Sequence, residues 1–255
     1  MAETHLPFLT HLASLSDTIS MRYFRSTSME TKEKHDKTMV SQADLAIEEA
    51  IKTAVHAQHP DWGILGEEYG SSQDQSPIRL IIDPIDSTQN FIRGLPWFAT
   101  LLAIESHGEI VAGLVSAPYY QERWWAEKGQ GSFYNGQKIS VSGISKLNEA
   151  QAFHGSLYGA ECKEMPSQFL PLMSKTHRQR GLGDYLSHMM VAMGCGEFAI
   201  DFGVKPWDIA PFKIIVEEAG GKVTNFDGKF SPYVSNIVAS NGFVHETVLT
   251  LVREN

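Results

Sequence analysis

The feature that most constrains this chain is an apolar strand that runs directly into two carboxylates. Residues 78–82 are rich in β-branched side chains and predict a buried strand, and Asp83 and Asp86 follow it. Because both acids stand at the end of one strand, they can converge there as oxygen ligands of a hard cation such as Mg²⁺. Ser87 and Thr88 then offer hydroxyls and backbone N–H groups where a helix can begin, and a helix N-terminus attracts phosphate. The segment therefore suits a phosphoester site.

The same segment has a purely structural interpretation. Pro84 lacks a backbone N–H and is expected to end the strand at Asp83. The Asp-Pro and Asp-Ser pairs are also typical of a turn followed by a helix cap. This segment alone does not decide between a site and a turn.

Three further acids occur beside predicted strand or helix ends. Glu67, in the sequence Gly-Glu-Glu, follows a short strand. Asp44 stands in the first turn of a predicted helix, where the helix dipole favours a negative charge, and Asp208 can cap another helix. Each acid alone has an ordinary structural role, but their joint occurrence favours a functional site.

The pattern along the chain predicts helices layered on sheets. Residues 26–38 are polar and predict a loop, Asn135-Gly136 predicts a hairpin turn, and residues 142–150 are the best candidate boundary. Helices are predicted over 8–25, 43–57, 184–193, 209–219 and from 245, and strands over 63–66, 78–82, 98–141 (a meander), 152–157, 197–202, 222–225 and 236–240.

Composition excludes several classes of protein. With 255 residues, 42% hydrophobic and 20% charged, the chain is long and apolar enough for one or two folded domains, which excludes general disorder. A net charge of −9 argues against a nucleic-acid binder. An anionic substrate remains compatible with this charge, because a metal ion can invert the local sign.

The sequence predicts a cytoplasmic protein without a membrane partner. Cys162 and Cys195 lack the spacing of a disulfide framework or a zinc site and are expected to be reduced thiols. The first residues show no signal peptide, and no apolar run approaches the roughly 20 residues that span a bilayer. The ten histidines show no helical ligand-pair spacing and are assigned no metal role.

Taken together, the motifs GEE, DPIDST, WDIAP and EEAGG resemble the inositol monophosphatase superfamily of Mg²⁺-dependent, lithium-sensitive phosphomonoesterases. The resemblance covers nearly the whole chain, from Asp44 through SNGFVHETVLTLV (240–252). It implies an α/β (α+β) layered αβαβα sandwich of the inositol monophosphatase/fructose-1,6-bisphosphatase type. It also implies an N-terminal α+β part (1–145) with most metal ligands, a C-terminal α/β part (146–255) that completes the site, and a homodimer.

Within this superfamily the chain is most similar to bacterial histidinol-phosphatases. The finer match is carried by FIRGLPWFATL (91–101), RWWAEKGQGSF (123–133) and GDYLSHMMVAMG (183–194). It implies hydrolysis of L-histidinol phosphate, a step of histidine biosynthesis, by in-line attack of a water activated by two or three Mg²⁺ ions, with Mn²⁺ as the alternative metal. The alternatives are an inositol-1-monophosphatase, a phosphatase of another small phosphomonoester or nucleotide, and a non-catalytic binding relative.

The resemblance also implies the roles of particular residues. The side chains of Glu67, Asp83, Asp86 and Asp208 and the backbone carbonyl of Ile85 would bind the metal. Asp44, Thr88 and Glu67 would be catalytic, with Asp44 and Thr88 orienting and deprotonating the water. Ser87 and Thr88 would hold the phosphate, and Asp184 and Asp201 would bind the amine and imidazole of the substrate.

Two positions depart from the family pattern. The family usually has glycine where this chain has Ser87, whose hydroxyl adds a donor, and more often has glutamate where this chain has Asp201, whose reach is shorter by a methylene. Lys34, in the predicted loop, would lie near the mouth of the site.

Overall fold

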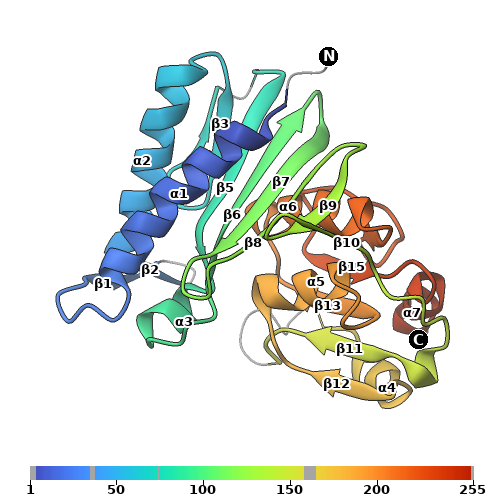
Figure 1. Cartoon of the computed structure of the whole chain (residues 1–255). Helices are drawn as coiled ribbons and strands as arrows, with labels where there is room; N and C mark the ends of the chain where they lie inside the picture. The colour runs from blue at the N-terminus through green and yellow to red at the C-terminus, as the bar shows by residue number, and fades with distance from the viewer. Residues whose placement is uncertain (1–3, 35–37, 74, 158–164, 254–255) are drawn as a thin grey trace.

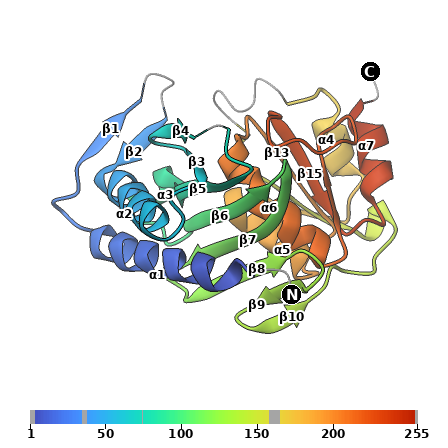
Figure 2. The ribbon, with the colours of Figure 1, turned by 90° about the horizontal axis from the view of Figure 1, so that it is seen from above.

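The computed structural model describes the chain except residues 1–3, 35–37, 74, 158–164 and 254–255. Helices and sheets alternate in five layers, which Figure 2 shows from above. Helices α1 (Leu6–Tyr23) and α2 (Gln42–Gln58) cover the outer face of the first sheet, and α5 (Asp184–Ala192) and α6 (Pro206–Glu218) lie between the two sheets. Helices α4 (Phe169–Ser174) and α7 (His245–Arg253) cover the far face of the second sheet (Figure 1). This order confirms the predicted αβαβα sandwich.

The first sheet has eight strands in the order β10-β9-β8-β7-β6-β5-β3-β4. Its strand pairs are antiparallel except β3 with β5, which are parallel neighbours. The turn Asn135-Gly136 joins β9 to β10 with positive φ at both residues, as predicted for a hairpin. Its strands are β3 (Gly63–Gly66), β4 (Gly70–Ser72), β5 (Ile78–Asp86), β6 (Ala99–Ser106), β7 (Glu109–Ala117), β8 (Glu122–Glu127), β9 (Gly131–Tyr134) and β10 (Gln137–Ile139).

The second sheet has five strands in the order β12-β11-β13-β15-β14. Strand β11 is parallel to β12 and β13, and β15 is antiparallel to β13 and β14. Its strands are β11 (Gln151–His154), β12 (Arg178–Arg180), β13 (Phe198–Phe202), β14 (Lys222–Thr224) and β15 (Asn236–Ser240). A 3₁₀ turn at Leu147–Glu149 leads into β11.

Several short elements were not predicted. The expected loop over 26–38 contains β1 (Thr31–Glu33), which pairs with β2 (Met39–Ser41), and β4, β12 and α4 were not predicted either. Strands β1, β2, β4 and β12 are three residues long, and all except β2 are mostly exposed, so they carry no readable alternation.

The prediction that Pro84 ends its strand was wrong. Strand β5 continues to Asp86, and its pairing with β6 shifts register between Asp83 and Asp86. The missing N–H of Pro84 falls in this irregular stretch, and its carbonyl accepts a hydrogen bond from Thr100 Oγ1 at 2.8 Å. The irregular pairing at this point therefore allows a proline within the strand.

Helix α6 starts three residues earlier than predicted, at Pro206, and Asp208 caps its first turn.

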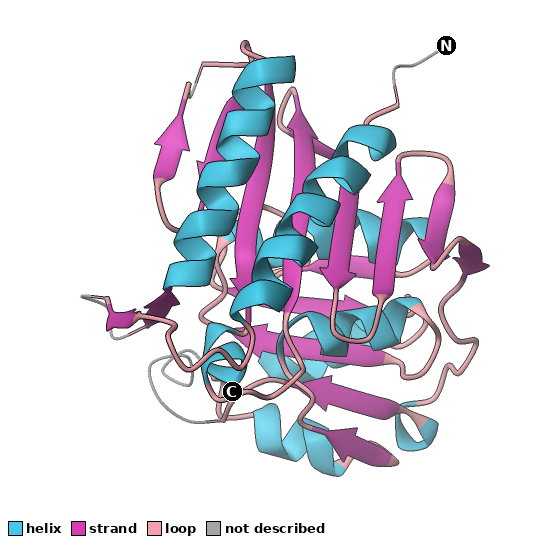
Figure 3. Ribbon diagram, turned by 60° about the vertical axis from the view of Figure 1, so that its left-hand side comes forward, coloured by secondary structure: helices cyan, strands magenta, loops and turns pink. Residues whose placement is uncertain are grey.

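The core fills the space on both faces of the first sheet and on the far face of the second. One apolar cluster lies under α1 and α2, which run side by side across the sheet (Figure 3). A second cluster, between the sheets, draws side chains from both of them, and a third lies under α4 and α7. The division into parts 1–145 and 146–255 stays a prediction.

None of the described helices is long and apolar enough to span a membrane. Cys195 is an exposed free thiol, as predicted, and Cys162 lies outside the described residues.

Candidate active site

Strand register explains why acids that are distant in sequence meet. Strands β3 and β5 are parallel, with Gly66 opposite Ile82, so that Glu67 and Asp83 leave the same edge of the sheet. The backbone N–H of Glu67 donates to the carbonyl of Ile82 at 3.3 Å. Helix α6 packs on the inner face of this sheet and places Asp208 beside the strand ends. The fold thus gathers these acids into one region.

The predicted metal ligands lie in a buried, strongly negative environment. Asp83 is 2% exposed and Asp86 is 7% exposed. Burial, reinforced by the charge of Glu67, raises the pKa of Asp83 well above its usual range. Burial and then the charge of Asp184 do the same to the pKa of Asp86, and burial followed by the charge of Glu67 raises that of Asp208. A cation at this position would lower the raised pKa values of all three acids.

The donor chemistry fits a hard divalent cation. The predicted ligand atoms are all oxygens, and Oδ1 of Asp83 is buried with no hydrogen-bond partner among the described residues. As the side chains lie, however, no three described His, Cys, Asp or Glu groups converge closely enough to hold an ion. The ammonium of Lys34 instead contacts Glu67 at 2.9 Å and Glu68 at 2.7 Å. A cation bound by Glu67 would therefore share this carboxylate with Lys34 or compete with it.

The two residues predicted to activate water are in contact. Thr88 Oγ1 lies 3.3 Å from Asp44 Oδ1 and 3.0 Å from the carbonyl oxygen of Ile85. Asp44 also closes a capping box at the start of α2, where Ser41 N donates to its Oδ2 at 2.8 Å. Burial outweighs these hydrogen bonds and raises the pKa of Asp44 to about 6. The carboxyl can therefore exchange a proton near neutral pH.

Ser87 adopts a backbone conformation that favours glycine. Its φ of 71° and ψ of 45° lie in the left-handed region, immediately before the short helix α3 (Thr88–Ile92). Its hydroxyl donates to Asp184 Oδ2 and accepts a hydrogen bond from Asn90 Nδ2 at 2.9 Å. The side chain that replaces the family's glycine therefore joins β5 to the start of α5.

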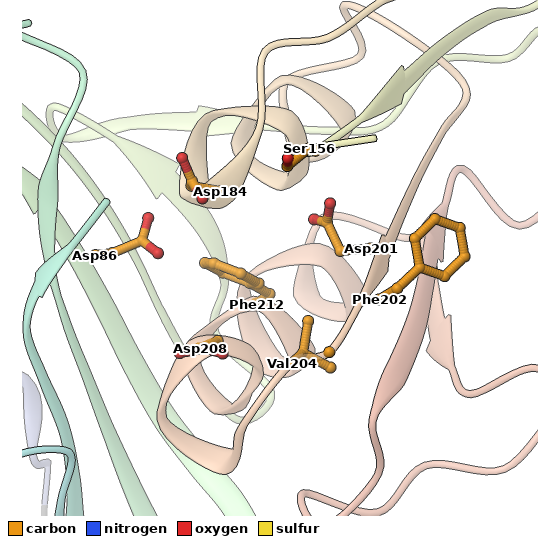
Figure 4. A pocket seen from close by; sticks show the side chains of 10 residues that line it. Asp86, Ser156, Asp184, Asp201, Phe202, Val204, Asp208 and Phe212 are labelled. Carbon is orange, nitrogen blue, oxygen red and sulfur yellow. The ribbon is translucent and has the colours of Figure 1, made fainter. Parts of the chain in front are cut away.

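A cavity of about 100 Å³ connects the two groups of predicted site residues. Figure 4 shows four carboxylates, those of Asp86, Asp184, Asp201 and Asp208, arranged around the ring of Phe212. The cavity wall therefore combines negative charge with an aromatic face. Its other lining residues are small or apolar: Gly155, Ser156, Phe202, Gly203 and Val204.

Glu48 is a residue that the sequence analysis missed. It is buried, and its carboxylate accepts the backbone N–H groups of Glu68 at 2.9 Å and Tyr69 at 3.1 Å. A Cβ at Gly66 would lie 1.9 Å from Glu48 Oε1, so the close approach requires glycine. Glu48 thus fixes the turn that carries Glu67. Its spacing of four residues from Asp44 on one helix was the available signal.

His188 was also missed. Its Nε2 lies 2.7 Å from Asp201 Oδ2. His188 follows Asp184 by four residues on α5 and therefore lies on the same side of that helix. That spacing could have singled it out, but no sequence signal joins it to Asp201 on β13.

Comparison with known proteins gives a consistent result. The sequence model of the inositol monophosphatase family matches residues 3–255. The chain is 36% identical over 255 residues to a histidinol-phosphatase of Mycobacterium tuberculosis, covering 98% of both chains. It is also 37% identical over 221 residues to a fructose-1,6-bisphosphatase/inositol-1-monophosphatase of Thermotoga maritima, covering 86% of this chain and 84% of that one.

Solved structures agree in fold. An IMPase of Thermotoga maritima superimposes with a TM-score of 0.86 at 34% identity, covering 97% of this chain and 96% of the other. An IMPase/NADP phosphatase complexed with Mg²⁺ and phosphate has a TM-score of 0.83 at 25% identity, covering 98% of this chain and 94% of the other.

Proposed function

The chain belongs to the inositol monophosphatase family, a family of Mg²⁺-dependent phosphomonoesterases, and on this premise we propose that it is a histidinol-phosphatase. The reaction is hydrolysis of L-histidinol phosphate to L-histidinol and phosphate. Within the family, the substrate depends on the alcohol that the site accepts, so the cavity beside the predicted metal ligands carries the proposal.

The observation that supports this substrate is the pair of acids at the cavity, of which Asp201 is buried and Asp184 is exposed at the cavity mouth. Asp184 and Asp201 face the cavity beside Asp86 and Asp208, and Asp201 is only 9% exposed. The protein around Asp184 reduces its hydration and raises its pKa to about 6, which leaves the group largely ionised at neutral pH. Buried carboxylates need a positive partner or hydrogen bonds. A cationic amino alcohol supplies that charge, whereas a neutral polyol does not.

The apolar part of the wall suits the other half of this substrate. Phe212 and Phe202 line the cavity with Val204. An imidazole ring can pack on an aromatic face while its N–H groups reach a carboxylate. The combination of acids and aromatic rings therefore matches an amine that carries a heteroaromatic group.

The predicted metal ligands would hold the metal ion on which catalysis depends. Glu67, Asp83, Asp86 and Asp208, with the carbonyl of Ile85, would hold Mg²⁺. The bound metal supplies a Lewis acid that polarises phosphoryl oxygens and lowers the pKa of the attacking water.

The remaining steps fall to the chain's own groups. The Thr88 hydroxyl, between the carbonyl of Ile85 and the carboxylate of Asp44, can accept a proton from water as it passes its own to Asp44. A pKa of about 6 suits Asp44 as the acceptor of that proton. Ser87 and Thr88 are proposed to hold the phosphate through backbone N–H and hydroxyl groups.

The alternative is another small phosphomonoester, such as inositol 1-phosphate. It is supported by the similarity to the Thermotoga maritima enzyme, whose identity to this chain matches that of the histidinol-phosphatase. A non-catalytic relative is disfavoured, because a chain without catalysis has no physical need for so many buried, mutually repelling acids.

The proposal is tested by measuring phosphate release from histidinol phosphate and inositol 1-phosphate side by side, with Mg²⁺ and with a chelator. We expect a kcat/KM at least about tenfold higher for histidinol phosphate, which corresponds to one ionic contact, and loss of both activities with chelator. Preference for the inositol ester would overturn the substrate assignment but not the phosphatase chemistry. Phosphate release that persists in the chelator would overturn the metal requirement.

A further inference from the structure

The buried imidazole of His188 lies directly behind the cavity. It stands on α5 and is 1% exposed. Its Nε2 contacts Asp201 Oδ2 at 2.7 Å, and its ring stacks on Phe212 with centroids 4.5 Å apart and planes 16° from parallel. His188 therefore contacts two residues of the cavity wall, one acidic and one aromatic, without lining the cavity itself.

The contacts of the two ring nitrogens define which one carries the proton. Nδ1 is buried and has no hydrogen-bond partner among the residues described. An unpaired N–H buried there would cost more than an unpaired lone pair, and a carboxylate can only accept a hydrogen bond. The geometry thus assigns the proton to Nε2, which donates to Asp201. In this contact His188 is the donor and Asp201 is the acceptor.

The second oxygen of Asp201 has a different environment. A Cβ at Gly155 would lie 2.4 Å from Asp201 Oδ1, so only glycine permits this position of the carboxylate. Gly155 and Asp201 both line the cavity. Oδ2 is thus held from behind by His188, while Oδ1 lies against the glycine at the cavity wall.

We propose that His188 is a positioning residue that determines substrate selectivity. By holding Oδ2, it fixes Asp201 as an oriented anion whose Oδ1 receives the cationic end of the substrate alcohol. This inference rests on the proposed function, because it takes a phosphomonoester of a cationic alcohol as the substrate. His188 also supports Phe212, so that one side chain orients both the charged and the aromatic part of the wall.

The test compares His188→Phe, which keeps a stacking ring without a donor, with His188→Gln, whose amide N–H can reach the position of Nε2. Kinetic constants are measured for histidinol phosphate and for glycerol 2-phosphate, whose alcohol is neutral. In His188→Phe we expect KM for histidinol phosphate to rise about ten- to hundredfold, the size of a hydrogen bond to a charged group. The kinetic constants for glycerol 2-phosphate and the kcat for histidinol phosphate should change less than about threefold. In His188→Gln, KM for histidinol phosphate should return most of the way to its wild-type value.

His245→Phe is the matched control. His245 is an equally buried histidine, bonded to Thr224 Oγ1 at 2.9 Å and Ser240 Oγ at 2.8 Å, outside the cavity. Its substitution should lower the melting temperature without changing the ratio between the two substrates. If His188→Phe does not fold, His188→Met replaces it, because methionine also lacks the donor and adapts to irregular space.

The outcomes separate the two proposals. Equal losses on both substrates in the His188 variants, or no change on either, would overturn the role of His188 while the wild-type preference for histidinol phosphate still supports the proposed function. A wild-type protein that shows no preference for histidinol phosphate over glycerol 2-phosphate would overturn the proposed function, and the role of His188 with it.

Discussion

The two sides of the site differ in how their acids are satisfied. On the metal side (Glu67, Asp83, Asp86 and Asp208), Asp86 and Asp208 accept backbone N–H groups, while burial and mutual repulsion raise their pKa values. On the alcohol side (Asp184, Asp201 and His188), each acid accepts a hydrogen bond from a side chain, Ser87 or His188. If the proposed ligands bind a cation, that cation offsets the repulsion on the metal side, whereas the acids on the alcohol side are already oriented by hydrogen bonds from the chain itself. The metal side therefore suits catalysis, and the alcohol side suits selection of the substrate.

Asp83→Asn breaks the metal side and leaves the alcohol side intact. Mg²⁺-dependent turnover should fall by more than about a hundredfold on every substrate, since even loss of a residue that only supports a metal ligand costs up to that much. The melting temperature of the chelated protein should not fall, because Asn keeps the shape of the side chain and cannot acquire the charge that burial and Glu67 disfavour. Phosphate release and thermal unfolding check both statements. Glu109→Gln, which removes an exposed acid paired with Lys128, is the control. Near wild-type activity in Asp83→Asn would contradict the assignment.

The pH dependence of stability tests whether Mg²⁺ neutralises the acids on and around the metal side in the unmutated protein. The folded-state pKa values of Asp44 (about 6) and Glu68 (about 7) are raised above those of the unfolded chain, chiefly by burial, and burial raises that of Asp83 in the same direction. Folding is then favoured by protonation, so this stabilisation is lost as pH rises through the folded-state values. Between about pH 6.5 and about pH 8, the chelated protein should lose at least about 3 °C in melting temperature.

Saturating Mg²⁺ should reduce this fall in melting temperature with pH, because a bound cation offsets the negative charge that forms as the acids ionise. His245, whose pKa burial lowers to about 4, contributes in the opposite direction only below about pH 6.5. Melting curves at a series of pH values, with Mg²⁺ and with chelator, test the expectation. The same slope in both conditions would mean that Mg²⁺ does not bind these acids.

Lys34→Met tests whether the ammonium on the metal side competes with the cation. Burial alone would lower the pKa of Lys34, but hydrogen bonds and charges from Glu68 and Glu67 outweigh it and raise the pKa, so the group stays charged. Its removal should reduce the Mg²⁺ concentration that gives half-maximal activity by about twofold to fivefold, the size of a partly exposed ion pair. An unchanged Mg²⁺ requirement with a raised KM would instead show that Lys34 contacts the substrate.

Ser87→Gly should give the smallest effect, at the junction of the two sides. Glycine relieves about 1 kcal/mol of left-handed strain, while loss of the bond to Asp184 costs about as much. The free energy of unfolding should therefore change by less than about 1 kcal/mol, and KM for histidinol phosphate should rise about threefold, about the effect of one modest hydrogen bond. Urea denaturation and steady-state kinetics measure these changes. Unchanged kinetics would show that Asp184 needs no support from Ser87.

The metal side could be predicted from sequence far better than the alcohol side. Asp83, Asp86 and Ile85 lie in one contiguous motif, and Asp208 stands in the first turn of a helix, so their local patterns made them candidates, to which the family resemblance then gave roles. The contact of His188 with Asp201 joins a helix to a strand, and only the packing of α5 on β13 determines it. Gly155 is necessary because of a close approach that no local pattern reveals. The bulge at Pro84 was not predicted for the same reason, because the pairing with β6 determines where β5 ends.

The most direct test of the division between the two sides is the kinetic effect of Asp201→Asn. The measurement is the ratio of kcat/KM for histidinol phosphate to kcat/KM for glycerol 2-phosphate, in the wild-type protein and in the variant, with Mg²⁺ saturating. If the alcohol side selects the substrate, this ratio should fall about ten- to hundredfold while hydrolysis of glycerol 2-phosphate stays within about threefold of wild type. An unchanged ratio, or an equal loss on both substrates, would contradict the account.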